Sequence, residues 1–294
     1  MSDIREMSLG WVRDLPSFKD YQVDQPEVKS MLAKLKAAGS GSAPPTLPGA
    51  VDLRPWFSSV ENQGSLGSCT AHAGVGLLEY YERRAYGKHV DASRLFLYKT
   101  TRNLLKWKGD TGAYLRSTMQ ALVLFGVPPE SYWPYDIAKF DEEPTPFLYA
   151  YGSNYQALKY YRLDPPGTAK FTLLTQIKTN LAAGLPAFFG FTVYSSYTQA
   201  SASNQGAIPF PTSADRVVGG HAVVVAGYDD TRIIRNSNPG STATTGALLI
   251  RNSWGSGWGQ GGYGWLPYEY VLRGLAVDWW SLISAEWVDS GHFG

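Results

Sequence analysis

The chain contains one cysteine, Cys69, and the residues around it support nucleophilic chemistry. Glycines and serines lead up to it in the stretch Q-G-S-L-G-S-C at 63–69, and the periodic run 71–86 that follows predicts a helix. A thiol in the first turn of a helix feels the positive end of the helix dipole, which favours thiolate over thiol. Because the thiolate is the nucleophilic form, we expect Cys69 to have a low pKa and to act as a nucleophile.

A cysteine nucleophile needs a base, and one of the four histidines is well placed for that role. His221 follows two glycines and opens the apolar run 222–226, so a buried strand would anchor it at the edge of a cleft. The other three are predicted to be a helix-packing residue, a loop residue and a residue near the C-terminus: His72, His89 and His292. We therefore predict that His221 is the base.

A third group should orient the imidazole, and two similar stretches offer an asparagine. Asn236 leads into a proline–glycine turn, which indicates a loop residue. Asn252 follows a predicted strand and precedes Trp254, whose indole would keep water away from a side-chain hydrogen bond and so strengthen it. This argument favours Asn252 over Asn236.

An oxyanion also needs hydrogen-bond donors, and Gln63 lies shortly before Cys69. Its side-chain amide and the backbone N–H of Cys69 are two such donors. The alternative is a loop glutamine that bonds only to the backbone. The sequence leaves both readings of Gln63 open.

The glycine pattern around 257–262 has the letters of a dinucleotide-binding motif but not its context. Such a motif requires a helix directly after it, whereas a strand-like stretch follows here. The chain also lacks paired cysteines and an H-E-x-x-H motif. We therefore expect neither cofactor nor metal.

Composition restricts the class of protein further. The 294 residues are 44% hydrophobic and 17% charged, with a formal net charge of +1, which predicts a compact globular body and gives no reason to expect nucleic acid as a partner. The sequence shows no secretory signal and no apolar run of membrane-spanning length. We expect a cytoplasmic monomer without membrane contact, and release by a signal-independent route stays open.

Periodicity predicts an α+β fold in which helices precede strands. Residues 1–46 read as an extension that contains a helix at 28–38 and a linker at 39–45. We predict a mainly helical lobe at 47–165 carrying Cys69 and a mainly β lobe at 166–294 carrying His221 and Asn252. The predicted helices are 70–86, 93–105, 114–125 and 172–183, the predicted ordered loop is 131–164, and the predicted strands are 187–194, 221–228, 246–252, 263–267 and 277–287.

Three motifs in order now resemble those of the papain-like cysteine peptidases, and in particular their disulfide-free bacterial branch. They are Q-G-S-L-G-S-C at 63–69, G-G-H-A-V-V-V-A-G-Y at 219–228 and N-S-W-G-S-G-W-G-Q-G-G-Y at 252–263. The resemblance implies two lobes, one helical and one β-barrel-like, with the active-site cleft between them. It implies that Cys69 is the nucleophile, His221 the base and acid, Asn252 the orienting residue and Gln63 the oxyanion donor.

The resemblance also implies roles for residues around that centre. Trp254 would shield the bond between Asn252 and His221, and Trp258 would line the leaving-group side of the cleft. Three residues would bind the substrate backbone: Gly112, Ala113 and Gly220.

The sequence departs from the family pattern at several positions. The family usually has a bonded pair of cysteines where Leu66 and Asp110 stand, and an aromatic residue where Thr70 stands. The gaps from Cys69 to the histidine and to the asparagine exceed the roughly 130–150 residues typical of such enzymes. Subsite specificity therefore does not carry over.

These features together predict a cysteine endopeptidase that acts on a peptide or protein substrate through a thioester acyl-enzyme. We further expect residues 1–46 to form a prosegment near the cleft, so that the enzyme is made as a zymogen. An exopeptidase, or an acyltransferase or transglutaminase with the same Cys-His-Asn set, is the alternative.

Overall fold

The computed structural model is described here for residues 8–17, 20–22, 25–26, 28–30, 33, 46–155 and 159–283. The predicted linker 39–45, most of the predicted helix 28–38, the end of the predicted strand 277–287 and His292 lie outside the described residues.

Helix α2 (Cys69–Tyr86) begins at the cysteine and ends where the sequence predicts, at Gly87, whose φ of 72° is in the left-handed region. Helix α3 (Arg94–Leu105) begins after Ser93, whose side chain accepts a hydrogen bond from the Phe96 N–H. These two helices confirm the predicted ranges to within a residue. Two further helices do so to within two residues: α4 (Leu115–Phe125) and α6 (Lys170–Ala182).

The stretch 131–164 is more regular than the predicted loop. Helix α5 (Pro146–Gly152) starts with a proline in its first turn, where the missing N–H costs nothing. The expectation of an ordered loop was wrong here. Helices of one or two turns are too short to show a hydrophobic period in the sequence, and tertiary packing stabilises them. The other elements of this part are η3 (Glu130–Tyr132), η4 (Ile137–Lys139), η5 (Ser153–Tyr155) and β2 (Lys159–Arg162).

The strands form a 7-stranded sheet in the order β2-β7-β3-β4-β5-β6, with β1 paired to β4. Its neighbouring strands are antiparallel. Within the described residues β2 and β6 do not pair with each other, so the sheet is open and the predicted barrel-like half is not closed into a barrel. The strands are β1 (Ala50–Asp52), β3 (Ala187–Tyr194), β4 (Val217–Ile234), β5 (Thr244–Arg251), β6 (Tyr263–Pro267) and β7 (Ala276–Ile283), and the short elements η2 (Arg54–Trp56), η6 (Ser195–Gln199) and α7 (Glu269–Leu272) complete the fold.

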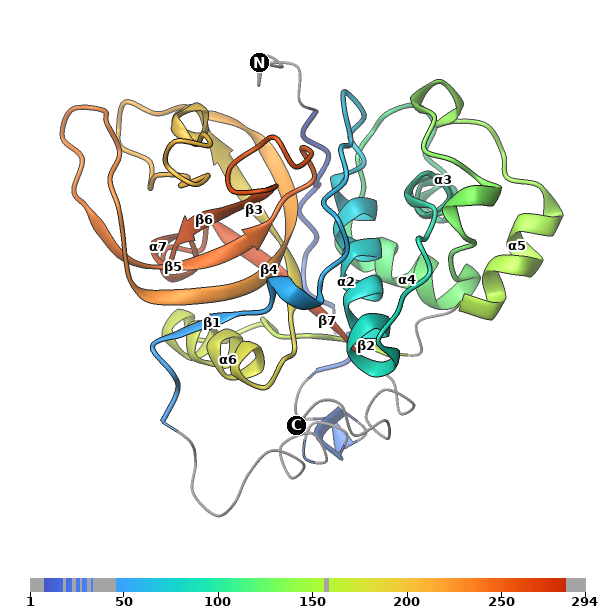
Figure 1. Ribbon diagram of the computed structural model, residues 1–294, viewed down its shortest axis with the longest axis horizontal. Coiled ribbons are helices and arrows are strands. Elements are labelled where there is room, and N and C mark those ends of the chain that lie inside the picture. The colour runs from blue at the N-terminus through green and yellow to red at the C-terminus, as the bar shows by residue number, and fades with distance from the viewer. Residues whose placement is uncertain are drawn as a thin grey trace.

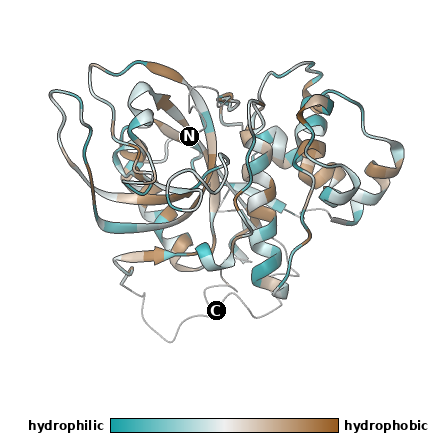
Figure 2. Cartoon of the chain, turned by 45° about the horizontal axis from the view of Figure 1, so that its top comes forward, coloured by the Kyte–Doolittle hydropathy of each residue, from teal (hydrophilic) through white to brown (hydrophobic). Residues whose placement is uncertain are grey.

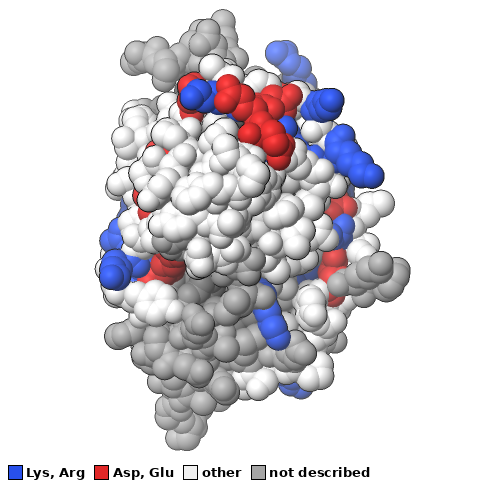
Figure 3. Space-filling view, turned by 90° about the vertical axis from the view of Figure 1, so that its right-hand side faces the viewer, with Lys and Arg blue, Asp and Glu red and all other residues white. Residues whose placement is uncertain are grey.

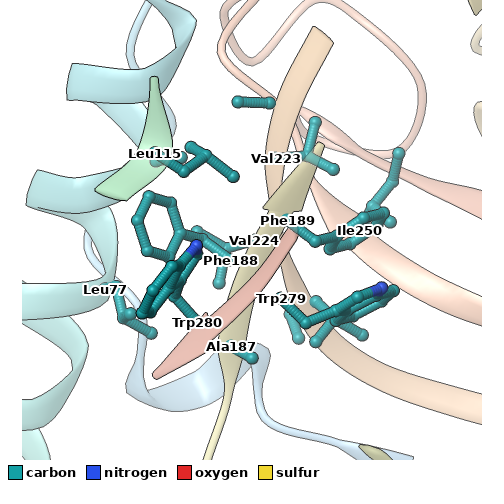
Figure 4. Close-up of a cluster of buried hydrophobic side chains, with 14 of the residues drawn as sticks. Leu77, Leu115, Ala187, Phe188, Phe189, Val223, Val224, Ile250, Trp279 and Trp280 are labelled. Carbon is teal, nitrogen blue, oxygen red and sulfur yellow. The ribbon is translucent and has the colours of Figure 1, made fainter. Parts of the chain in front are cut away.

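The core lies on both faces of the sheet, because successive side chains of a strand point to opposite sides. Phe189 stacks on Trp279 with ring centroids 3.8 Å apart, on the side of Ile250. Phe188 and Trp280 lie on the other side, toward the helices (Figure 4). The two successive tryptophans of β7 therefore extend one hydrophobic core to both faces of the sheet.

Helix α2 stands at the middle of the molecule, with α3, α4 and α5 on one side and the strands β3 to β6 on the other (Figure 1). Strands β1 and β2 come from the range predicted to be helical, yet both belong to the sheet. The helices carry both hydrophobic and hydrophilic residues (Figure 2), yet α2 is buried on all sides from Cys69 to Tyr81. The chain near the N-terminus passes between the helices and the sheet (Figure 1).

The helical side of the surface has a broad uncharged area, and acidic and basic side chains lie around its edges, most densely at the top of the view (Figure 3). Some of the charged groups of α3 are paired, as in the contact of Arg102 with Asp141 at 2.7 Å. Among the described residues, no helix combines the length and the apolar character that crossing a membrane demands.

Candidate active site

Cys69 is the first residue of α2, and its side chain is completely buried. Burial raises the pKa of the Cys69 thiol to about 11, although backbone hydrogen bonds from Ala222 and Gly10 act in the opposite direction. The sequence predicted a low pKa from the helix dipole. In this structure the loss of hydration outweighs the dipole, and Gly10 from the N-terminal part of the chain lies within hydrogen-bonding distance of the thiol.

His221 and Asn252 come from neighbouring strands, and the strand register explains why they meet. Strands β4 and β5 are antiparallel with Val224 opposite Arg251, which brings His221 next to the residues that follow β5. The Nε2 atom of His221 lies 2.8 Å from the Oδ1 atom of Asn252. This contact fixes the imidazole, with the Asn252 oxygen as acceptor and the ring N–H as donor.

The imidazole is buried as deeply as the thiol. Burial lowers the pKa of His221 to about 4, against the opposing effect of its hydrogen bond to Asn252. Its Nδ1 atom is buried and has no hydrogen-bond partner within the described part of the chain. One ring nitrogen is therefore oriented and the other is unengaged.

Trp254 lies against the imidazole of His221. Its ring stacks on that of His221 with centroids 4.8 Å apart and an interplanar angle of 25°. Trp258 packs edge-on against Trp254 with centroids 5.4 Å apart, and both indoles are buried. Asn236, the rejected alternative, bonds instead to Gln199 and Asp215.

Gln63 is fully buried, and its amide is held by a residue that the sequence reading missed. The Oε1 atom of Gln63 accepts a hydrogen bond of 2.5 Å from the hydroxyl of Ser253. The backbone N–H of Ser253 donates to Asn252 Oδ1 at 2.8 Å. Ser253 thus aligns both Gln63 and Asn252, and its place between Asn252 and Trp254 was the available signal.

The Nε2 atom of Gln63 donates to two carbonyl oxygens, those of Leu66 and Ser8, each at 2.9 Å. The second contact crosses to the N-terminal segment, by which we mean residues 8–17. The group predicted to receive an oxyanion is therefore occupied by a carbonyl of the chain itself.

The residues predicted to bind substrate backbone also contact the N-terminal segment. Ala113 donates its N–H to Gly10 O at 2.8 Å and accepts from the Val12 N–H at 3.1 Å. Gly220 O accepts from the Trp11 N–H at 3.2 Å. Gly112 has a φ of 69°, and a Cβ atom there would lie 2.1 Å from Gly10 O, so only glycine fits.

Hydrogen bonds form next to the two positions where the family pattern suggests a cysteine pair, Leu66 and Asp110. The carboxylate of Asp110 accepts from the Gly67 N–H at 3.0 Å and from the Tyr98 hydroxyl at 2.6 Å. Leu66 is buried beside this contact. The loop that precedes Cys69 is therefore held to the stretch around Asp110, and through it to α3, by hydrogen bonds.

Comparison with known proteins gives the same family throughout. The model of the papain family cysteine proteases matches residues 47–271. A peptidase C1-like protein of Acanthamoeba polyphaga mimivirus, described as uncharacterised, is 31% identical over 284 residues, covering 93% of this chain and 86% of the viral protein. Chicken (Gallus gallus) cathepsin K is 27% identical over 225 residues, which is 74% of this chain but 58% of cathepsin K.

Solved structures agree with this assignment. Xylellain, a cysteine protease from Xylella fastidiosa, is 32% identical with a TM-score of 0.72, covering 95% of this chain and 97% of the xylellain chain. Digestive procathepsin L2 of Tenebrio molitor has a TM-score of 0.66 over 96% of this chain and 79% of its own, and at 19% identity it shows the fold alone.

The fold and the matches define a thiol protease, a hydrolase with an α+β, papain-like fold. The chain belongs to the papain family of cysteine proteases. Its similar proteins include viral, bacterial and animal members, so the predicted bacterial branch stays a prediction.

Proposed function

We propose that the protein is a cysteine endopeptidase in which Cys69 is the nucleophile, His221 the base and acid, Asn252 the orienting residue and Gln63 an oxyanion donor. The 2.8 Å contact between His221 Nε2 and Asn252 Oδ1 carries this proposal. It leaves Nδ1 as the nitrogen that exchanges a proton with the thiol.

The reaction proceeds through a thioester. His221 takes the proton of Cys69, and the thiolate attacks the peptide carbonyl to form a carbon–sulfur bond. The tetrahedral oxyanion receives hydrogen bonds from Gln63 Nε2 and the Cys69 N–H, and its collapse expels the amine, which His221 protonates. Water deprotonated by His221 then attacks the thioester, releases the carboxylic acid and restores the thiol.

The supporting residues have defined tasks in this proposal. Trp254 keeps water from the His221–Asn252 contact, and Ser253 holds the Gln63 amide in place. One N–H of Gln63 stays bonded to Leu66 O, and the N–H that meets Ser8 O is the donor for the oxyanion. Gly112, Ala113 and Gly220 bind the substrate backbone, and Trp258 lines the leaving-group side.

We also propose that the N-terminal segment gates the enzyme as a zymogen. Its backbone engages Ala113 and Gly220, and its Ser8 carbonyl engages Gln63, so substrate and segment compete for the same groups. Burial under the segment disfavours both the thiolate and the imidazolium. A covered site is thus held as neutral thiol and neutral imidazole, and uncovering it favours the reactive ion pair.

Labelling with a thiol-directed epoxide tests both parts of the proposal. The full chain, the chain without residues 1–38 and the Cys69→Ala variant of each are compared. We expect slow labelling of the full chain, fast labelling after deletion and none in either Cys69→Ala variant. Labelling that persists without Cys69 contradicts the nucleophile, and equal labelling of long and short chains contradicts the gate.

Product analysis of the deleted chain separates the proposed activity from its alternatives. We expect hydrolysis within N-blocked peptides. If only dipeptide substrates with a free N-terminus are cleaved, the protein is an exopeptidase. If an added amine is incorporated into the product in competition with water, it is an acyltransferase.

A further inference from the structure

The two proposed oxyanion donors belong to the two ends of one short loop. Gln63 contributes a side-chain N–H and Cys69 its backbone N–H, and the loop 63–69, which we call the oxyanion loop, joins them. Donors stabilise a developing oxyanion only when they are held in advance at the place where the charge forms. The shape of the oxyanion loop therefore decides whether both donors reach the same oxygen.

The hydroxyl of Tyr135 bridges the two ends of the oxyanion loop. It donates to Gln63 O at 3.0 Å and lies 2.6 Å from Ser68 Oγ. Ser68 directly precedes Cys69, and both Gln63 and Ser68 are fully buried. One hydroxyl thus connects the residue that carries the first donor with the neighbour of the second.

The direction of each hydrogen bond around Tyr135 follows from the chemistry of the groups. A carbonyl oxygen can only accept, so the Tyr135 hydroxyl proton is directed to Gln63 O, and the Ser68 hydroxyl must donate to Tyr135. The Nδ1 atom of His72 lies 3.1 Å from Ser68 O and 3.3 Å from Ser68 Oγ, so this nitrogen carries the remaining proton. The chain has one donor for each contact, and it is complete only with a hydroxyl at position 135.

His72 supports Tyr135 from helix α2. Burial lowers the pKa of His72 to about 3, so the imidazole is neutral at physiological pH and carries a single N–H. Its Nε2 atom is buried and has no hydrogen-bond partner within the described ranges, in agreement with a proton on Nδ1. The Tyr135 ring packs edge-on against the imidazole, with centroids 4.9 Å apart and an interplanar angle of 83°.

The backbone of Tyr135 is attached to the helical side of the protein. Its N–H donates to Glu130 Oε1 at 2.5 Å, and Glu130 Oε2 accepts from the Arg94 N–H, at the start of α3, at 3.3 Å. These partners belong to the body and not to the N-terminal segment. We therefore expect Tyr135 to keep its place when the segment leaves the site.

We propose that Tyr135 is a positioning residue: its hydroxyl fixes the oxyanion loop so that the Gln63 side chain and the Cys69 N–H meet one oxygen. It touches no reacting atom and acts through the two donors. The inference rests on the proposed peptidase function, because it concerns the donors that this function assigns. Since those donors act on the transition state, loss of the hydroxyl should lower kcat and leave KM nearly unchanged.

The test is Tyr135→Phe in the full chain carrying Trp11→Ala, which should let a small N-blocked peptide reach the site. The change removes the hydroxyl and keeps the ring that packs on His72. Removing an oxyanion donor costs about 10²–10³ in rate, and displacing one costs less, so we expect kcat to fall about tenfold with KM within about twofold. Rates are normalised by active-site titration, so that misfolded protein does not count.

Tyr149→Phe is the matched control. Tyr149 is half-buried like Tyr135, and its hydroxyl also has two partners, Asn103 and Glu143, neither of which belongs to the oxyanion loop. Its kcat and KM should equal those of the parent chain. An unchanged kcat in Tyr135→Phe, or an equal loss in both variants, overturns the inference and leaves the proposed function intact.

A double-mutant cycle separates positioning from a general structural role. Tyr135→Phe is repeated in the Gln63→Ala background, where the side-chain donor is missing. Residues that act through one another are not additive, so the tenfold loss should shrink to less than about threefold. A full tenfold loss in both backgrounds overturns the inference. Full turnover of Gln63→Ala alone overturns the proposed oxyanion donor and the inference with it.

A measurement without turnover covers the case in which no peptide is hydrolysed. In the full chain the Gln63 amide bonds to Leu66 O and Ser8 O, and the hydrogen exchange of its side-chain N–H groups can be followed by NMR. Tyr135→Phe should accelerate this exchange by about tenfold or more, and Tyr149→Phe should not. That result supports the positioning role even if the proposed activity fails, and unchanged exchange in Tyr135→Phe overturns it.

Discussion

The two ends of the N-terminal segment are attached to the body by different kinds of contact. The inner end, Ser8 to Val12, uses backbone hydrogen bonds and one buried indole. The outer end uses charge: Arg116 bonds to Asp14 and, just beyond the segment, to Asp20 through Nε at 2.7 Å and through Nη2 at 2.9 Å.

The two kinds of contact have different effects: the inner contacts block the proposed substrate-binding groups, and the outer contacts hold the segment on the body. The inner contacts occupy groups that a substrate needs, and their strength depends on shape and is nearly independent of salt. The outer contacts touch no proposed catalytic group. Arg116 and Asp14 lie near the surface, 16% and 17% exposed, whereas Asp20 is 3% exposed, so the Asp14 pair is the one that salt reaches. Ion pairs at such positions weaken as salt screens them. We therefore expect shape to govern the reactivity of the site and charge to govern how long it stays covered.

The largest expected effect is on the pH dependence of thiol alkylation. In the full chain the pKa of Cys69 is about 11, so thiolate forms only as pH rises toward that value, and the iodoacetamide rate should climb about tenfold per pH unit from 7 to 10. Trp11→Ala should uncover the thiol and give a fast rate already at pH 7, with a much flatter profile. Trp107→Ala, which removes a half-buried tryptophan that packs on Tyr114, is the control. Parallel profiles for all three chains would show that the segment does not bury the thiol.

The next effect is on peptidase activity. Replacing a buried tryptophan by alanine costs about 3–5 kcal/mol, which corresponds to roughly a hundredfold or more in the docking equilibrium of the inner end. Trp11→Ala in the full chain should therefore raise the initial rate on a small N-blocked peptide by up to that factor. Rates are normalised by active-site titration. A variant as slow as the unmodified chain would mean that the indole does not hold the segment over the site.

A smaller effect is expected at the outer end, where the readout is salt dependence. Arg116→Gln removes the charge that faces Asp14 and Asp20 and should raise the initial rate about tenfold at low salt. In the unmodified chain the rate should rise with salt, and in Arg116→Gln it should no longer do so. Arg116→Lys keeps the charge and should retain the salt response. Identical salt curves for Gln and Lys variants would remove charge as the basis of the outer attachment.

The sequence predicted the helices and strands whose hydrophobic residues repeat over many positions, and it missed the elements that depend on tertiary contacts. Helix α2 was readable because apolar spacing ends at a glycine, and β4 because an apolar run follows two glycines. The irregular turns of 131–164 left no such period. The extra residue in β7, where Trp280 faces Phe188 but Val277 faces Gly190, was equally unreadable, since a bulge depends on the partner strand.

The site divides in the same way. Cys69, His221 and Asn252 were proposed from residue type and local context, and the register of β4 with β5 places the last two in contact. The raised pKa of Cys69 was not predictable from its helix position, because it depends on what covers the thiol. The sequence did not indicate roles for Ser253 and Tyr135, because the role of a serine or a tyrosine depends on the groups that the fold brings against it.

The smallest expected effect is on stability, and it concerns Asp110, a charged residue that bonds to neither end of the N-terminal segment. Asp110 is exposed in part and accepts from the Gly67 N–H and the Tyr98 hydroxyl. Asp110→Asn keeps one acceptor oxygen and loses the charge, so it should lower the free energy of unfolding by about 1 kcal/mol in urea titrations. Because neither end of the segment bonds to Asp110, the alkylation profile of Cys69 should stay as in the unmodified chain. A variant with unchanged stability but faster alkylation would show that the wall around Gly67, and not the segment alone, keeps the thiol covered.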